Sequence, residues 1–245
     1  MRRAWCLERK LTSQHGGHIM TMWANFSSLI VQLLRILSNC FPRTILHSIV
    51  RLLPYFVLGS ICYGFDIIFT SVQDRFYLKA VVDNTAHGII ALVSWCIISE
   101  IQTRKDLIDA IVCGVIAFGI DVDHFIAARS FKLQDALHLS RRPFLHATTV
   151  VFIVVPILQV WFAQNISFLR SLPYMFVVAV ISHHLRDGTR RGLWFWPFGS
   201  TPPLPYWLYI SCTVALPFFM KEMKRSLDKI VVIPISRQNS VLVDV

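Results

Sequence analysis

The chain has 245 residues, of which 55% are hydrophobic and only 16% charged, and its formal net charge is +10 at pH 7. A soluble domain carries about 25% charged residues, so the composition excludes an ordinary soluble protein and indicates an integral membrane protein. The basic residues are scattered between apolar runs, which argues against nucleic acid as a partner and favours anionic lipid headgroups or phosphate.

Three regions follow from the distribution of charge and hydropathy. Residues 1–45 are expected to form a basic extension, in which 19–40 is an amphipathic or interfacial helix, with a signal anchor as the alternative. Residues 46–222 form the helical membrane domain. Residues 223–245 are expected to be a poorly ordered polar tail with a short β-like patch at 230–235.

The membrane domain contains six apolar runs that we predict to be membrane-spanning helices. Because the linkers between them are short and no repeat is visible, we predict one all-α, multi-pass bundle of five to six transmembrane helices, embedded in a lipid bilayer. The runs are 52–70, 86–101, 108–120, 147–163, 171–182 and 206–220.

Polar residues of the kind that bind metals lie at particular ends of these runs. If the six runs alternate in direction, the loops after the first, third and fifth share one side of the membrane. The opposite loops, 102–105 and 164–170, hold no histidine. We therefore expect a site on one membrane face, formed by Asp83, His87, Asp121, Asp123, His124, His146, His183, His184 and Asp187, with Asp66 leaning the same way.

The spacing within each group supports this expectation without deciding it. Asp121 and His124 are three apart, and His183 and Asp187 are four apart, so each pair shares a helix face. His184 points about 100° away from His183. Asp83, four residues before His87, could be a helix N-cap or could orient a ligand histidine from behind.

The charge bias does not assign the side of the membrane that the site faces. Nine basic residues lie in the loops on each side, so the positive-inside rule does not assign an orientation. If the arginines on the site side serve a phosphate ligand and are discounted, the site faces away from the cytosol. We expect an integral multi-pass protein, with an endomembrane favoured.

Two other features have simpler interpretations. The six cysteines form no C-x-x-C pair, and four lie inside apolar runs, so we expect small buried apolar residues and no disulfide framework. The aromatic turn over 192–199 is better interpreted as part of an interfacial belt than as a lid over the site.

Three motifs carry a resemblance to a known family. The chain resembles the YdjM-like inner-membrane proteins, a family described as metal-dependent hydrolases, over roughly residues 50–220. The family pattern has a histidine where Arg141 stands, although His138 could substitute one turn upstream. The motifs are Asp121-Val122-Asp123-His124, Arg141-Arg142-Pro143-Phe144-Leu145-His146, and Ser182-His183-His184 with Arg186-Asp187-Gly188.

The resemblance implies a divalent metal site, with zinc as the leading ion, that hydrolyses a phospholipid-like ester. The metal ligands would be His87, Asp121, His124, His146 and His183. Asp123 or Asp187 would accept a proton from the attacking water, and Arg142 and Arg186 would neutralise a phosphate. The alternative, favoured by Arg141, is a non-catalytic membrane protein that retains a polar site for structure or partner binding. A metal or proton carrier ranks last, because only Asp66 lies deep in a span.

Overall fold

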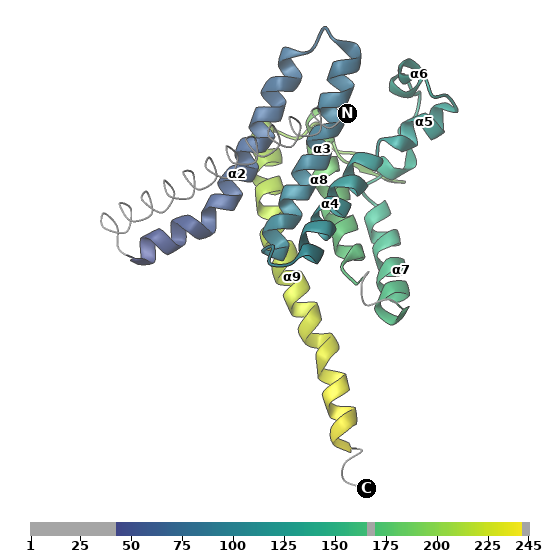
Figure 1. The fold of residues 1–245 in the computed structure, drawn as a ribbon. Helices are drawn as coiled ribbons and strands as arrows, with labels where there is room; N and C mark the ends of the chain where they lie inside the picture. The colour runs from purple at the N-terminus through teal and green to yellow at the C-terminus, as the bar shows by residue number, and fades with distance from the viewer. Residues whose placement is uncertain (1–42, 166–169, 242–245) are drawn as a thin grey trace, which may run out of the picture. The chain divides into compact units, whose positions relative to one another are not determined.

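The computed structural model describes residues 43–165 and 170–241, and most of them are helical (Figure 1). The chain divides into two units, Met1–Leu53 and Pro54–Val245, and everything described below from Pro54 on belongs to the second. The expected extension over residues 1–45 and its interfacial helix lie almost entirely outside the described residues. The elements in order are α2 (Arg43–Ser71), α3 (Phe76–Ser99), α4 (Arg104–Gly119), α5 (Val122–Ala128), α6 (Leu133–Leu137), the 3-10 turn η1 (Phe144–His146), α7 (Val150–Asn165), α8 (Leu172–Arg191), β1 (Trp194–Phe195), β2 (Gly199–Ser200) and α9 (Tyr206–Val241).

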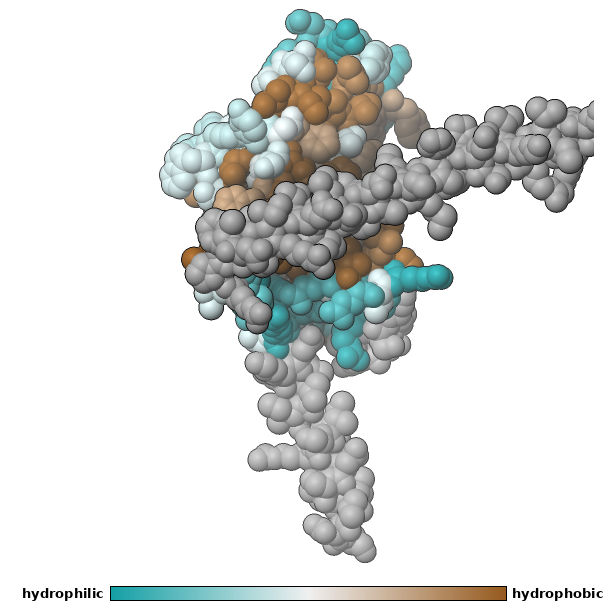
Figure 2. Space-filling view, turned by 60° about the vertical axis from the view of Figure 1, so that its left-hand side comes forward, coloured by the Kyte–Doolittle hydropathy of each residue, from teal (hydrophilic) through white to brown (hydrophobic). Residues whose placement is uncertain are grey.

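Three helices are long and apolar enough to cross a membrane, which confirms the prediction of an all-α membrane protein. They cover Thr44–Ser71, Phe76–Ser99 and Arg104–Ala128. The first buries only 11% of its most apolar window within the protein, as expected for a helix whose apolar side chains face lipid. The apolar stretch of α7, Val150–Trp161, is shorter. On the face drawn in Figure 2, hydrophobic residues gather between hydrophilic zones.

Helix α3 begins ten residues earlier than the sequence predicts, and this overturns one interpretation of Asp83. The apolar run was expected to start at residue 86, with Asp83 as a possible N-cap. In the structure α3 starts at Phe76, so Asp83 lies inside the helix and cannot be its N-cap. A carboxylate is stable at this position because Arg186 and Arg190 of α8 pair with it.

Helices α3, α4 and α8 pack on one another and surround the main core. Glycines let α3 and α4 approach closely: a Cβ added to Gly114 would lie 2.9 Å from the carbonyl oxygen of Gly88. Around this contact the core buries Trp95, Cys113 and Met175. Because α3 and α4 are antiparallel neighbours, the start of α3 and the end of α4 lie at the same end of the bundle (Figure 1).

The chain after residue 222 differs from the expectation of a separate polar tail. Helix α9 runs without interruption from Tyr206 to Val241, so the β-like patch predicted at 230–235 is wrong. Extending an existing helix costs far less free energy than nucleating a new element. Residues 230–235 therefore continue the helix despite their β propensity. Of the six cysteines, the four that the structure describes are all free thiols.

Candidate metal centre

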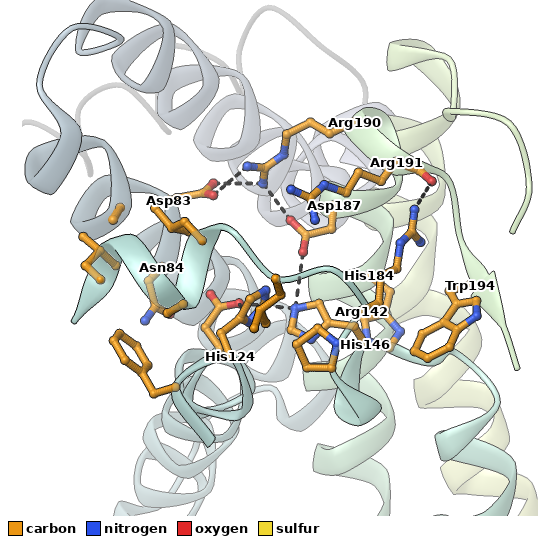
Figure 3. A pocket seen from close by; sticks show the side chains of 18 of the residues that line it. Asp83, Asn84, His124, Arg142, His146, His184, Asp187, Arg190, Arg191 and Trp194 are labelled. Carbon is orange, nitrogen blue, oxygen red and sulfur yellow. Dashed lines mark hydrogen bonds and ion pairs between the residues drawn. The ribbon is translucent and has the colours of Figure 1, made fainter. Parts of the chain in front are cut away.

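A cavity of about 400 Å³ lies where α3, the junction of α4 and α5, η1 and α8 meet. Figure 3 shows its polar side, where His124 and His146 lie near Asp187 and the arginines at the end of α8. The polar residues come from segments that are separated by up to a hundred positions in the sequence. The structure therefore brings these segments together at one end of the bundle, as the sequence predicts.

Four ligand atoms converge at the base of this cavity, and we call their residues the tetrad: Asp121, His146, His183 and Asp187. Asp121 Oδ1 lies 3.3 Å from His146 Nε2 and 3.5 Å from His183 Nε2. Asp187 Oδ2 lies 3.6 Å and 3.5 Å from the same two nitrogens. The two nitrogens are themselves 3.3 Å apart.

The other ring nitrogens of the two histidines already have acceptors. His183 Nδ1 lies 3.2 Å from the carbonyl oxygen of Ala117, and His146 Nδ1 lies 3.3 Å from Asp123 Oδ2. If each Nδ1 carries the proton and donates it, each neutral ring turns an Nε2 lone pair toward the centre. An orientation of this kind, with a carboxylate or carbonyl behind the ring, is the usual one for histidines that bind metals.

The spacing of the tetrad fits a small divalent ion. A tetrahedral site with bonds of about 2.0–2.1 Å has edges of about 3.3–3.4 Å between its ligand atoms. The five distances given above lie between 3.3 and 3.6 Å. Two imidazoles and two carboxylates are also a donor set that zinc accepts. The residues present therefore fit a divalent metal.

The electrostatics of the cluster also call for positive charge at its centre. Burial alone would lower the pKa of His146, but the carboxylates of Asp121 and Asp123 outweigh burial and raise it. The arrangement therefore attracts a cation: a proton on the imidazole when no metal is bound, or a metal that displaces the proton.

Asp123 and His124 form a second layer behind the tetrad. Asp123 Oδ2 accepts a hydrogen bond from the backbone N–H of Leu145 at 2.9 Å as well as facing His146. His124 Nδ1 lies 3.2 Å from Asp123 Oδ1 and 3.7 Å from Asp121 Oδ1. The His124 ring stands edge-on to His146 and lines the cavity.

The remaining histidines of the predicted site support the tetrad from outside. His87 Nε2 lies 3.5 Å from Asp187 Oδ1, and its ring stacks on His183 with centroids 3.7 Å apart. His184 Nε2 lies 2.9 Å from the carbonyl oxygen of Leu145, so it connects α8 to η1. His138 is exposed, and its Nδ1 faces the carbonyl oxygen of Gln134. It does not reach the cluster.

The arginines have partners that the sequence did not predict. Arg186 is only 3% exposed and pairs with Asp66 of α2 and Asp83 of α3. Arg190 pairs with Asp83 at 2.7 Å and with Asp187 at 2.6 Å. We call Asp66, Asp83, Arg186 and Arg190 the arginine network. Arg142, which was expected to bind phosphate, donates to the backbone carbonyls of Arg191 and Gly192.

A tight turn after α8 brings the aromatic hairpin to the cavity. Gly192 has a φ of +70°, and a Cβ there would lie 1.9 Å from the carbonyl oxygen of Thr201, so only glycine fits this turn. The turn leads into β1, where the carbonyl of Trp194 accepts a hydrogen bond from the Thr148 N–H at 2.7 Å. Trp194 lines the cavity, although the sequence alone favoured a simple interfacial belt.

Two roles were missed from the sequence. Asp66 pairs with Arg186 from a helix 120 positions away, and no local pattern announces such a partner. Arg190 was more accessible, because it follows Asp187 by three residues on the same helix face and pairs with it. A search for opposite charges at helical spacing around each candidate ligand would have found it.

The fold and the cluster define a helical membrane protein with a histidine–aspartate site at one end of its bundle. Comparison with known proteins finds relatives that are also named as transmembrane proteins. The chain is 45% identical over 166 residues to transmembrane protein 267 of Mus musculus, covering 65% of this chain and 76% of the mouse protein. It is 39% identical over 188 residues to the Bos taurus protein of that name, covering 74% and 83%.

The chain therefore belongs to the transmembrane protein 267 family. The Danio rerio member is 39% identical over 164 residues, covering 65% of this chain and 74% of its own length. No protein-family model matches the chain. No solved structure matches it either.

Proposed function

We propose that this chain is a metal-dependent hydrolase that acts on a phospholipid-like ester at the membrane surface. The observation that carries the proposal is the tetrad, whose atoms have the spacing of a divalent site and lie at the base of a cavity. Asp121, His146, His183 and Asp187 hold the ion, and zinc is the favoured metal. The motif resemblance to the YdjM-like hydrolases, which no family-model match supports, belongs to this proposal.

The residues around the tetrad have distinct tasks in this proposal. A divalent ion would supply Lewis acidity and a water molecule acidic enough to react near neutral pH. Asp123 orients His146, and His87 orients Asp187, because each faces the back of a ligand. His124 lines the cavity beside Asp121 and Asp123, so it accepts the proton of the attacking water.

The six-span topology and an endomembrane location also belong to the proposal. The first half of α3, the junction of α4 and α5 and the second half of α8 contribute to neighbouring His/Asp groups, which supports their lying toward the same side of the membrane. A glycosylation site engineered between Gln134 and Leu139 tests this. Use of that site requires the tetrad to face the lumen, and protection from glycosylation places it on the cytosolic side.

A second function is supported by the completeness of the tetrad. Four protein ligands are typical of structural zinc sites, whereas catalytic sites keep one position open. Arg141, which stands where the resembling family has a histidine, favours the same alternative. In this case the ion joins the junction of α4 and α5 to η1 and α8 and has a structural role alone.

Metal analysis of the purified protein comes first, with His183→Ala as the variant that removes a ligand. We expect about one zinc per chain in the wild type and none in the variant, and a metal-free wild type would contradict both functions. Turnover of a lipid-ester panel then separates them. His124→Ala should keep its metal and lose roughly 10²- to 10⁴-fold in rate if it is the proton acceptor. Turnover that is insensitive to chelator would refute the hydrolase.

A further inference from the structure

The wall of the cavity includes side chains that also face the bilayer. Tyr77 and Val81 of α3 and Phe118 of α4 line the cavity, and they are 69%, 61% and 49% exposed. Both helices are long and apolar enough to cross a membrane. Apolar side chains that are exposed on such helices contact lipid tails. Beside its polar end, the cavity therefore has an apolar edge that exposed side chains of α3 and α4 form.

The polar rim of the cavity carries an excess of positive charge. Four arginines and three aspartates line it, and a divalent ion would add two further positive charges. The aspartates are already engaged by Arg186, Arg190 and the histidines. A site of this kind favours an anionic ligand.

Two of the four arginines are free to bind that ligand. Arg142 donates to backbone carbonyls, and Arg190 is held by Asp83 and Asp187. The side chains of Arg141 and Arg191 have no hydrogen-bond or ion-pair partner in the described part of the structure, and both residues line the cavity. Figure 3 shows the Arg191 side chain extending beside Arg190 and Asp187. A guanidinium with unused donors matches the oxygens of a phosphate.

We propose that the cavity takes a phosphate-bearing lipid directly from the bilayer, with its hydrocarbon chain passing between Val81 and Phe118 and its phosphate held by Arg141 and Arg191. This deepens the proposed function, on which it rests for the identity of the site, by naming the residues that recognise the phosphate and the route by which the lipid enters. Arg141 and Arg191 then determine specificity for the phosphate, whereas Val81 and Phe118 determine specificity for the chain.

The test uses the full chain in phosphatidylcholine nanodiscs and a fluorescent phosphonate analogue of phosphatidic acid, which cannot be hydrolysed at that bond. We expect unlabelled phosphatidic acid to displace the probe, and diacylglycerol and glycerol 3-phosphate to fail, because each lacks one half of the ligand. Equal displacement by glycerol 3-phosphate would show a site for free phosphate esters. Equal displacement by diacylglycerol would show a site for any lipid. Either result overturns the proposal.

Variants locate the two halves of the ligand. The double substitution Arg141→Gln and Arg191→Gln should weaken binding about ten-fold or more, because it removes charge-assisted hydrogen bonds. Val81→Trp should close the opening and weaken binding similarly. Val115→Trp is the matched control, since Val115 is 63% exposed on α4 but does not line the cavity. Equal binding by Val81→Trp and Val115→Trp would refute the route.

Metal content measured on the same samples separates this proposal from the proposed function. If the wild type holds no metal but binds the probe, the hydrolase fails and the lipid site stands. If the wild type holds metal and turns over a water-soluble ester but does not bind the probe, the lipid site fails and the hydrolase stands.

Discussion

The tetrad and the arginine network are both partly buried polar clusters at the same end of the bundle, but they are balanced differently. In the arginine network each carboxylate faces a guanidinium: Arg186 contacts Asp66 and Asp83, and Arg190 also contacts Asp83. In the tetrad two carboxylates face two imidazoles whose Nδ1 atoms already have acceptors. Arg190 reaches only one of these carboxylates, that of Asp187.

The difference shows that protein groups alone balance the charges of the arginine network, whereas they do not balance those of the tetrad. Buried charges are stable only when they are paired. The arginine network satisfies this requirement and joins α2, α3 and α8 as a structural element. The tetrad satisfies it only when a proton or a metal ion supplies positive charge. The two clusters should therefore respond oppositely to mutation and to chelation.

The largest effect is expected from breaking the arginine network. Arg186→Ala leaves the carboxylate of Asp66 without a guanidinium and that of Asp83 with Arg190 alone. Removal of one partner of a fully buried pair costs about 3–5 kcal/mol. Because the two aspartates are partly exposed and Asp83 keeps Arg190, we expect a loss near the lower end of that range and a lower thermal midpoint in detergent. Arg225→Ala is the control, because its pair with Glu222 is exposed and such pairs contribute about 0–1 kcal/mol. Equal midpoints for the two variants would show that the network is not structural.

Removal of metal should affect only the tetrad. A ligand at a hundred times its dissociation constant stabilises the folded state by about 2.7 kcal/mol. Chelator should therefore lower the thermal midpoint of the wild type and leave that of His183→Ala unchanged. If chelator lowers both midpoints equally, the metal that it removes is not bound by the tetrad.

Much of the candidate site could be predicted because membrane topology is a strong constraint. Once the apolar runs alternate across a bilayer, residues at the ends of the third and fifth runs must share a side. Asp121 and His183 could be grouped in this way although 62 positions separate them, and their side chains lie 3.5 Å apart.

The sequence could not predict which polar residues face the cavity and which face one another. Arg186 and Arg142 were expected to bind phosphate because arginines beside histidines suit that role. In the structure Arg186 is held by acidic residues of two other helices, and Arg142 by backbone carbonyls. Such partners are set by helix rotation and packing, which no local pattern encodes. The early start of α3 was missed for the same reason, because the cost of Asp83 within a helix is offset by arginines a hundred positions away.

The smallest effect is expected from Asp123, which acts on the tetrad through His146. Asp123→Asn keeps the size of the side chain but removes the negative charge behind the His146 ring. Loss of such a supporting group lowers metal affinity about 10- to 100-fold. Competition with a chromophoric chelator measures this change. Asp135→Asn is the matched control, because Asp135 is exposed and, among the described residues, its side chain bonds only to Ser130.

The Asp123 result also shows whether Asp123 supports the metal centre or the position of η1. Asp123 Oδ2 accepts a hydrogen bond from Leu145 as well as facing His146, so Asp123→Asn could instead act by displacing η1. In that case the variant would bind metal more weakly, and its metal-free form would also be less stable than the metal-free wild type. A weaker metal affinity with an unchanged thermal midpoint of the metal-free protein assigns Asp123 to the metal centre, because only the cation-dependent cluster has then been altered.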